Sequence, residues 1–86
     1  MNKEFVSIKN YIVWLCGLFE IEFNERLCSE YERFVGGNEY KLFVLDDYDD
    51  VLLGMNGNWY WCVERNEEVR FVEVDKNELE VIKSLI

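Results

Sequence analysis

The chain has 86 residues, of which 50% are hydrophobic and 16% aromatic. This composition excludes a disordered chain and a second domain, so we expect one domain spanning residues 1–86 that builds its core without disulfides or metal. The 18 acidic residues outnumber the 9 basic ones, giving a net charge of −9, which argues against a nucleic-acid-binding surface and against binding to anionic membranes.

The first 35 residues have helical periodicity. Their apolar residues recur at spacings of three and four, which places them on one face of a helix. We predict two helices, Lys3–Leu18 and Glu22–Val35. Gly36 and Gly37 then provide a helix stop, because glycine readily adopts the left-handed conformation that ends many helices.

After these glycines the pattern changes to that of strands. Short apolar stretches are separated by polar clusters, and Asn56-Gly57 is a strong hairpin signal because both residues tolerate positive φ. The predicted strands are Tyr40–Leu45, Val51–Met55, Asn58–Glu64 and Val69–Val74.

A final helix is predicted after these strands. Asp75 or Asn77 can cap it, and its apolar positions are Leu79, Ile82, Leu85 and Ile86. The predicted fold class is α+β: two N-terminal helices, an antiparallel β-meander of three to four strands and a short C-terminal helix. We expect the helices to cover one face of the meander.

The residue types argue against an enzyme. The chain has no histidine, which removes the usual general base and most zinc sites. Asp46–Asp50 lacks the glycine and distal glutamate of a calcium loop, and Glu39-Tyr40-Lys41 resembles the end of a nuclease motif but has no strand carboxylate upstream. We therefore predict no catalytic residue, cofactor or metal.

The cysteines and the apolar stretches indicate a compartment. The chain has an odd number of cysteines with no close pair, which does not look like a disulfide framework. Each of the three, Cys16, Cys28 and Cys62, lies in an apolar run typical of a buried thiol. The start of the chain shows no secretory signal, and the longest apolar run, Tyr11 to Phe19, is too short to span a bilayer. We expect a cytoplasmic protein.

The second half carries most of the acidic surplus, since residues 36–86 hold twelve acidic and five basic residues. Strand alternation places Trp59, Trp61 and Val63 on one face and Tyr60, Cys62 and Glu64 on the other. One set should lie under the helices and the other should be partly exposed. Each aromatic residue can belong either to the core or to a binding interface, and the sequence does not decide between the two. The predicted partner-binding residues are Asp46, Asp47, Tyr48, Asp49, Asp50, Tyr60, Glu64, Glu67 and Glu68.

Two segments carry a family resemblance. Leu18–Arg33, with its apolar-Glu-Phe-polar-Glu-Arg core at Ile21–Arg26, resembles the second-helix region of the colicin D immunity family, and Val74–Leu85 looks like that family's last helix. That family is all-helical, whereas residues 40–74 here read as strands; the meander is instead similar to segments of the SMI1/KNR4-like immunity superfamily. Both resemblances imply a protein that binds a cognate toxin domain and blocks it.

The hypothesis from the sequence is therefore an immunity protein that occludes a basic partner, a toxin or nuclease domain, with an acidic face. The alternative is a phage-encoded anti-defence protein, directed against a CRISPR or restriction enzyme, that mimics the charge of nucleic acid. Both share the small size and the acidity, and gene context separates them: an upstream toxin gene favours the first, and a phage operon favours the second.

Overall fold

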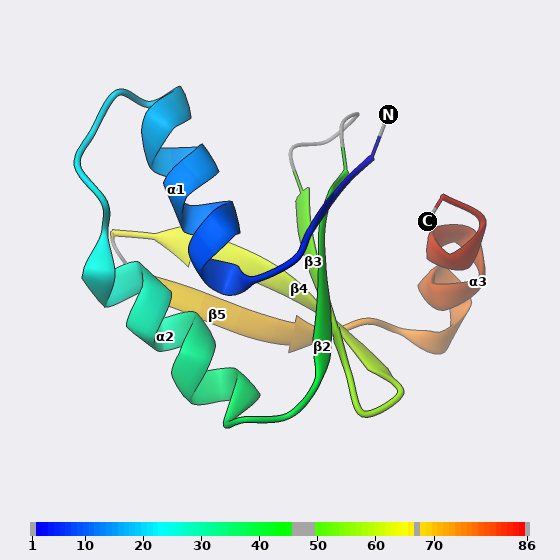
Figure 1. Ribbon diagram of the computed structural model, residues 1–86. Coiled ribbons are helices and arrows are strands. Elements are labelled where there is room, and N and C mark those ends of the chain that lie inside the picture. Colours follow the sequence, from blue (N-terminus) through cyan, green and yellow to red (C-terminus); the bar gives the residue numbers. More distant parts are fainter. Residues whose placement is uncertain (1, 46–49, 67, 86) are drawn as a thin grey trace.

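The computed structural model describes residues 2–45, 50–66 and 68–85 (Figure 1). Within these ranges it contains helices and an antiparallel sheet, which confirms the predicted α+β class. In chain order the elements are β1 (Lys3–Phe5), α1 (Ile8–Leu18), α2 (Glu25–Val35), β2 (Tyr40–Leu45), β3 (Asp50–Met55), β4 (Asn58–Arg65), β5 (Glu68–Glu73) and α3 (Lys76–Leu85).

The described strands form one sheet in the order β1-β2-β3-β4-β5, so every strand pairs with its neighbour in the chain. The predicted hairpin is confirmed, since Asn56 and Gly57 have φ angles of 55° and 79° between β3 and β4. The predicted meander of three to four strands is present as β2 to β5. The sheet gains a fifth strand because β1 pairs with β2, with Phe5 opposite Leu42.

The prediction that the first helix begins at Lys3 is wrong. Helix α1 begins at Ile8, because the Ser7 hydroxyl caps it by accepting a hydrogen bond from the Asn10 amide at 3.1 Å. Phe5 fits the helical spacing for another reason: from β1 its ring packs against Tyr11 and Trp14 of α1, at centroid distances of 5.5 and 5.3 Å.

The second helix is shorter than predicted at its start and ends as predicted. It begins at Glu25 rather than Glu22, because Asn24 Oδ1 accepts a hydrogen bond from the Leu27 amide at 3.0 Å. Gly36 ends the helix with a φ of 57°, and its amide donates to the Glu32 carbonyl. The predicted glycine stop is therefore confirmed.

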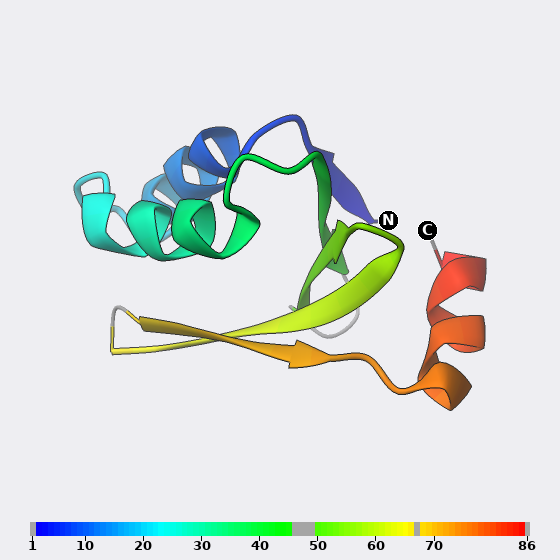
Figure 2. The ribbon, with the colours of Figure 1, turned by 90° about the horizontal axis from the view of Figure 1, so that it is seen from below.

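The helices lie on both faces of the sheet (Figure 2). Helices α1 and α2 cover the face that we call the inner face, and α3 lies against the opposite, outer face. The prediction that all helices cover one face is thus wrong for α3. The outer face also carries apolar side chains, and Ile82 of α3 is buried against Leu52 of β3.

The inner face holds the main core. Fully buried Tyr11, Tyr31 and Leu53 lie at its centre, where the two helices meet β3 and β4. The buried state expected for the three cysteines is confirmed, since Cys16, Cys28 and Cys62 are all enclosed in this core. Within the described ranges, no helix is both long enough and apolar enough for a membrane span.

Candidate partner-binding surface

The structure describes four of the nine predicted partner-binding residues, and it separates them between the two faces of the sheet. Tyr60 and Glu64 lie on the inner face, and Asp50 lies at the start of β3 with an exposed side chain. Glu68 is also exposed, at the start of β5. The other five, which lie outside the described residues, are Asp46, Asp47, Tyr48, Asp49 and Glu67.

Tyr60 and Glu64 are in contact with the N-terminal helices. The Tyr60 ring is half-buried and meets Phe34 of α2 edge to face, with centroids 5.0 Å apart. Glu64 Oε2 accepts two hydrogen bonds, from the Tyr11 hydroxyl at 2.9 Å and from the Tyr31 hydroxyl at 2.6 Å. One carboxylate therefore joins α1 and α2 to β4.

This network perturbs the groups around it. Burial is the largest cause that raises the pKa of the Tyr11 and Tyr31 hydroxyls, and the charge of Glu64 raises both further. Burial likewise raises the pKa of the Cys62 thiol to about 12. These groups stay protonated near neutral pH, so the tyrosines act as hydrogen-bond donors and the thiol is a poor nucleophile.

The polar groups around this network are paired with one another. No cluster of three or more Cys, Asp or Glu side chains among them is placed to hold a metal ion. Every buried side-chain oxygen and nitrogen in the described ranges has a hydrogen-bond partner. In the Tyr11–Glu64–Tyr31 network both tyrosine hydroxyls are satisfied by one carboxylate oxygen.

The outer face has an uncovered apolar centre. The register pairs Trp61 with Val72 and Val63 with Arg70, so the four side chains share this face. Val63 and Val72 are each 44% exposed, because α3 packs on Leu52 and Trp61 and does not extend over the two valines. We call the surface formed by Asp50, Trp61, Val63, Val72 and Glu78 the valine surface.

Two adjoining hollows lie along the valine surface. One, of about 410 Å³, is bordered by Asp50, Trp61, Glu78 and the two valines. The other, of about 480 Å³, lies toward the β4–β5 turn and shares the same valines. Its charged residues are Arg65, Glu68 and Arg70.

The charges around the two valines are therefore divided. Asp50 and Glu78 lie on one side, and the Glu78 carboxylate also accepts a hydrogen bond from Trp61 Nε1 at 3.2 Å. On the other side Glu68 is paired with Arg65 in the register, and its Oε1 lies 3.7 Å from the guanidinium Nη2 of Arg26 in α2. The side near α3 thus carries carboxylates, and the side near the β4–β5 turn carries Arg65 and Arg70 together with Glu68.

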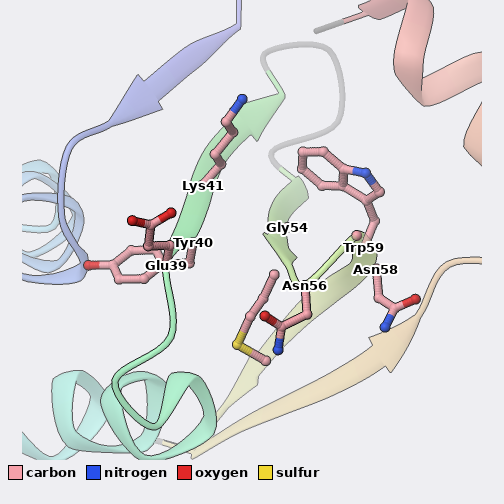
Figure 3. Close-up of a pocket in the computed structure, with 9 residues that line it drawn as sticks. Glu39, Tyr40, Lys41, Gly54, Asn56, Asn58 and Trp59 are labelled. Atoms are coloured by element: carbon pink, nitrogen blue, oxygen red, sulfur yellow. The ribbon is translucent and has the colours of Figure 1, made fainter.

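A third hollow lies at the β3–β4 hairpin (Figure 3). Trp59 lies over Gly54, where an added Cβ would come within 2.5 Å of the indole ring, so this position requires glycine. Tyr40 points away from Trp59 toward the start of α1, where its hydroxyl accepts a hydrogen bond from the Ile8 amide at 2.9 Å. The lining of this third hollow contains one acid, one base and neutral amides. The hollow therefore lacks the separation of charge found at the valine surface.

Comparison of the chain with protein-family models, with curated proteins and with solved structures finds no match. The candidate surface therefore depends on the geometry of this chain alone. Sequence reasoning placed Val63 beside Trp61 on one face but did not single out Val72. The alternation of side chains along β5 could have identified Val72, because Val72 and Arg70 point to one face of the sheet and Val69 and Phe71 point to the other.

Proposed function

We propose that this protein binds a basic protein domain and blocks it, in the manner of an immunity protein that neutralises a nuclease toxin. The observation that supports this proposal is the valine surface, where exposed Val63 and Val72 adjoin the carboxylates of Asp50 and Glu78. In the sequence, Asp50 is the last residue of the acidic run that begins at Asp46. Apolar and acidic contacts are thus available next to each other.

The chemistry of the surface fits such a partner. Protein interfaces combine an apolar centre with a polar rim. A nuclease must present Lys and Arg to hold the phosphates of its substrate, and carboxylates on an inhibitor accelerate and orient the encounter with that basic cleft. Val63 and Val72 would supply the centre of the contact, and Asp50 and Glu78 would supply charge at its border.

The same surface favours an inhibitor over a mimic of nucleic acid. A mimic gains its affinity from carboxylates placed where phosphates would bind, so binding would be governed by charge alone. Exposed valines between charged residues add an apolar contribution that a phosphate-binding groove does not reward. The two functions therefore predict different responses to substitution of the valines.

A calorimetric titration against the purified product of the adjacent gene tests the proposal. Asp50→Lys should weaken binding about tenfold or more, and the loss should shrink between about 50 and 300 mM salt as the charges are screened. Val63→Thr combined with Val72→Thr should also weaken binding, at every salt concentration, because threonine keeps the strand conformation but removes apolar area.

The matched control is Glu39→Lys. Glu39 is exposed and precedes β2, at the opposite end of the β2–β3 hairpin from Asp50, so this variant makes the same charge change away from the valine surface. Equal losses for the two lysine variants would reduce the effect to net charge. Loss from Asp50→Lys without any effect of the threonine pair would favour the nucleic-acid mimic, and no binding by the unsubstituted protein would refute inhibition of that partner.

A further inference from the structure

The connection between α1 and α2 exposes a second apolar surface. Phe19 is 65% exposed and Ile21 is 56% exposed, and the flanking Leu18 and Phe23 are also exposed. We call residues 18–23 the apolar loop. It lies at the end of the molecule opposite α3 in both views (Figures 1 and 2). It is therefore distinct from the valine surface, whose acidic side adjoins α3.

The backbone of this loop is fixed at both ends. The Ile21 amide donates to the Cys16 carbonyl at 2.9 Å, and the Glu20 amide donates to the Gly17 carbonyl at 3.2 Å. This pattern is a Schellman motif, with Glu20 in the left-handed conformation at a φ of 56°. Beyond the loop, Asn24 caps α2. The exposed side chains are thus presented by an ordered turn, which lowers the entropy lost on binding.

An ordered exposure of this kind has a cost for the protein. A residue other than glycine in the left-handed conformation is unfavourable by about 1 kcal/mol or more, and apolar surface that stays exposed to water contributes no hydrophobic stabilisation. Several exposed apolar side chains within one short segment make that segment a candidate binding surface. The turn combines the left-handed Glu20 with the exposed side chains of Phe19 and Ile21.

The charges of the loop select the kind of partner. Glu20 and Glu22 alternate with the apolar residues, and Glu25 follows at the start of α2; all three are exposed. Two copies of the loop would bring these carboxylates together, which disfavours self-association. Lipid surfaces prefer apolar segments flanked by Lys and Arg. A protein partner with an apolar pocket and basic residues at its rim would match both the apolar side chains and the carboxylates of the loop.

We propose that the apolar loop is a second docking site, which inserts Phe19 and Ile21 into an apolar pocket on a protein partner whose rim carries Lys or Arg. The carboxylates of Glu20 and Glu22 pair with that rim. This site does not depend on the proposed function, because its residues and its place in the fold differ from those of the valine surface.

Photocrosslinking followed by titration tests this docking site. The full-length protein carrying p-benzoyl-phenylalanine in place of Phe19 is irradiated in its host cells, and the protein joined to it is identified and purified. The purified partner is then titrated with unsubstituted protein and with Phe19→Ser and Ile21→Ser. Each serine variant should bind about tenfold or more weakly, as for anchor residues at other interfaces. Glu20→Lys with Glu22→Lys should weaken binding most at low salt.

Val81 provides the matched control. It lies on α3 and is 61% exposed, close to the exposure of Phe19, but it belongs to neither surface. The crosslinker at Val81 should not join the same partner, and Val81→Ser should bind it normally. Circular dichroism melts should show that each serine variant keeps its fold, since none of the three side chains is buried.

Several results would overturn the inference. They are a crosslink from Phe19 to a second copy of this chain, cosedimentation with vesicles of phosphatidylglycerol that Phe19→Ser abolishes, no product beyond that of the Val81 probe, or unchanged affinity of both serine variants. Titration of the same partner with Asp50→Lys separates the two proposals. A partner that is sensitive to Phe19→Ser and insensitive to Asp50→Lys supports the apolar loop while contradicting the role of the valine surface for that partner.

Discussion

The two faces of the sheet differ in how completely helices cover them, and β3 shows the contrast within two consecutive residues. Leu53 points to the inner face and Leu52 to the outer face, and both side chains are fully buried. Around Leu53 the cover consists of α1 and α2, joined by aromatic contacts such as that between Tyr11 and Tyr31. Around Leu52 the described residues that supply the cover are those of α3 and Val74, which precedes it.

This difference indicates how so small a domain can fold and still offer a surface. The inner face encloses most of the buried residues together with the hydrogen-bonded Glu64. The outer face is closed near Leu52 and left open at Val63 and Val72. We infer that stability is concentrated on the inner face, which leaves the outer face available for a partner. The following experiments test this division, from the largest expected effect to the smallest.

Truncation of the two leucines compares the faces directly. Leu53→Ala should lower the free energy of unfolding by about 3–5 kcal/mol, and Leu52→Ala by about 2–3 kcal/mol. The smaller loss is expected on the outer face because α3 can shift to fill part of the cavity. Urea unfolding of both variants measures the difference. Equal losses, or a larger loss for Leu52→Ala, would contradict the division between the faces.

Alkaline pH should act on the inner face. Tyr11 and Tyr31 have pKa values raised above the ordinary 10.0, and that of Cys62 is raised to about 12. The unfolded chain releases these protons at lower pH than the folded chain does. The stabilisation is therefore complete below about pH 9 and is lost as pH rises above it, by up to about 1.4 kcal/mol per pH unit for each group. Urea unfolding between pH 8 and pH 11 measures this loss.

Tyr31→Phe provides the control for that titration. It removes one donor to Glu64 and one of the titrating groups. At pH 8 the variant should be less stable by about 1.5–3 kcal/mol, as expected for a lost hydrogen bond to a charged group. Its stability should also fall less steeply above pH 10. A slope identical to that of the unsubstituted protein would show that Tyr31 does not contribute to the alkaline transition.

The features that the sequence predicted correctly depend on a few neighbouring residues. The turn at Asn56-Gly57 requires positive φ within the turn itself, and the stop at Gly36 requires one glycine after a periodic segment. Alternation along β4 separated Trp61 from Tyr60 without knowledge of the rest of the fold, and the structure has this arrangement. Local chemistry sufficed for each.

The features that could not be predicted depend on distant residues. A three-residue strand such as β1 is too short to show a period, and its pairing with β2 spans most of the first half of the chain. Glu64 reads as a surface acid, yet its partners Tyr11 and Tyr31 lie 53 and 33 positions away. Because both faces of the sheet are apolar, periodicity also could not show which face α3 covers.

The smallest expected effect concerns the attachment of α3 to the outer face. Trp61 Nε1 donates a hydrogen bond to Glu78 Oε2 at 3.2 Å in an exposed setting, so Glu78→Ala should change global stability by only about 0.5–1 kcal/mol. The amides of α3 should nevertheless exchange with solvent faster, while those of α1 and α2 should not, because opening of α3 leaves the inner face intact. Hydrogen exchange measured by mass spectrometry resolves the three helices. Glu80→Ala is the control on the same helix, since Glu80 is also exposed. Faster exchange in α1 and α2 as well as α3 would mean that the two faces unfold as one unit, which would remove the basis for treating the outer face as separable.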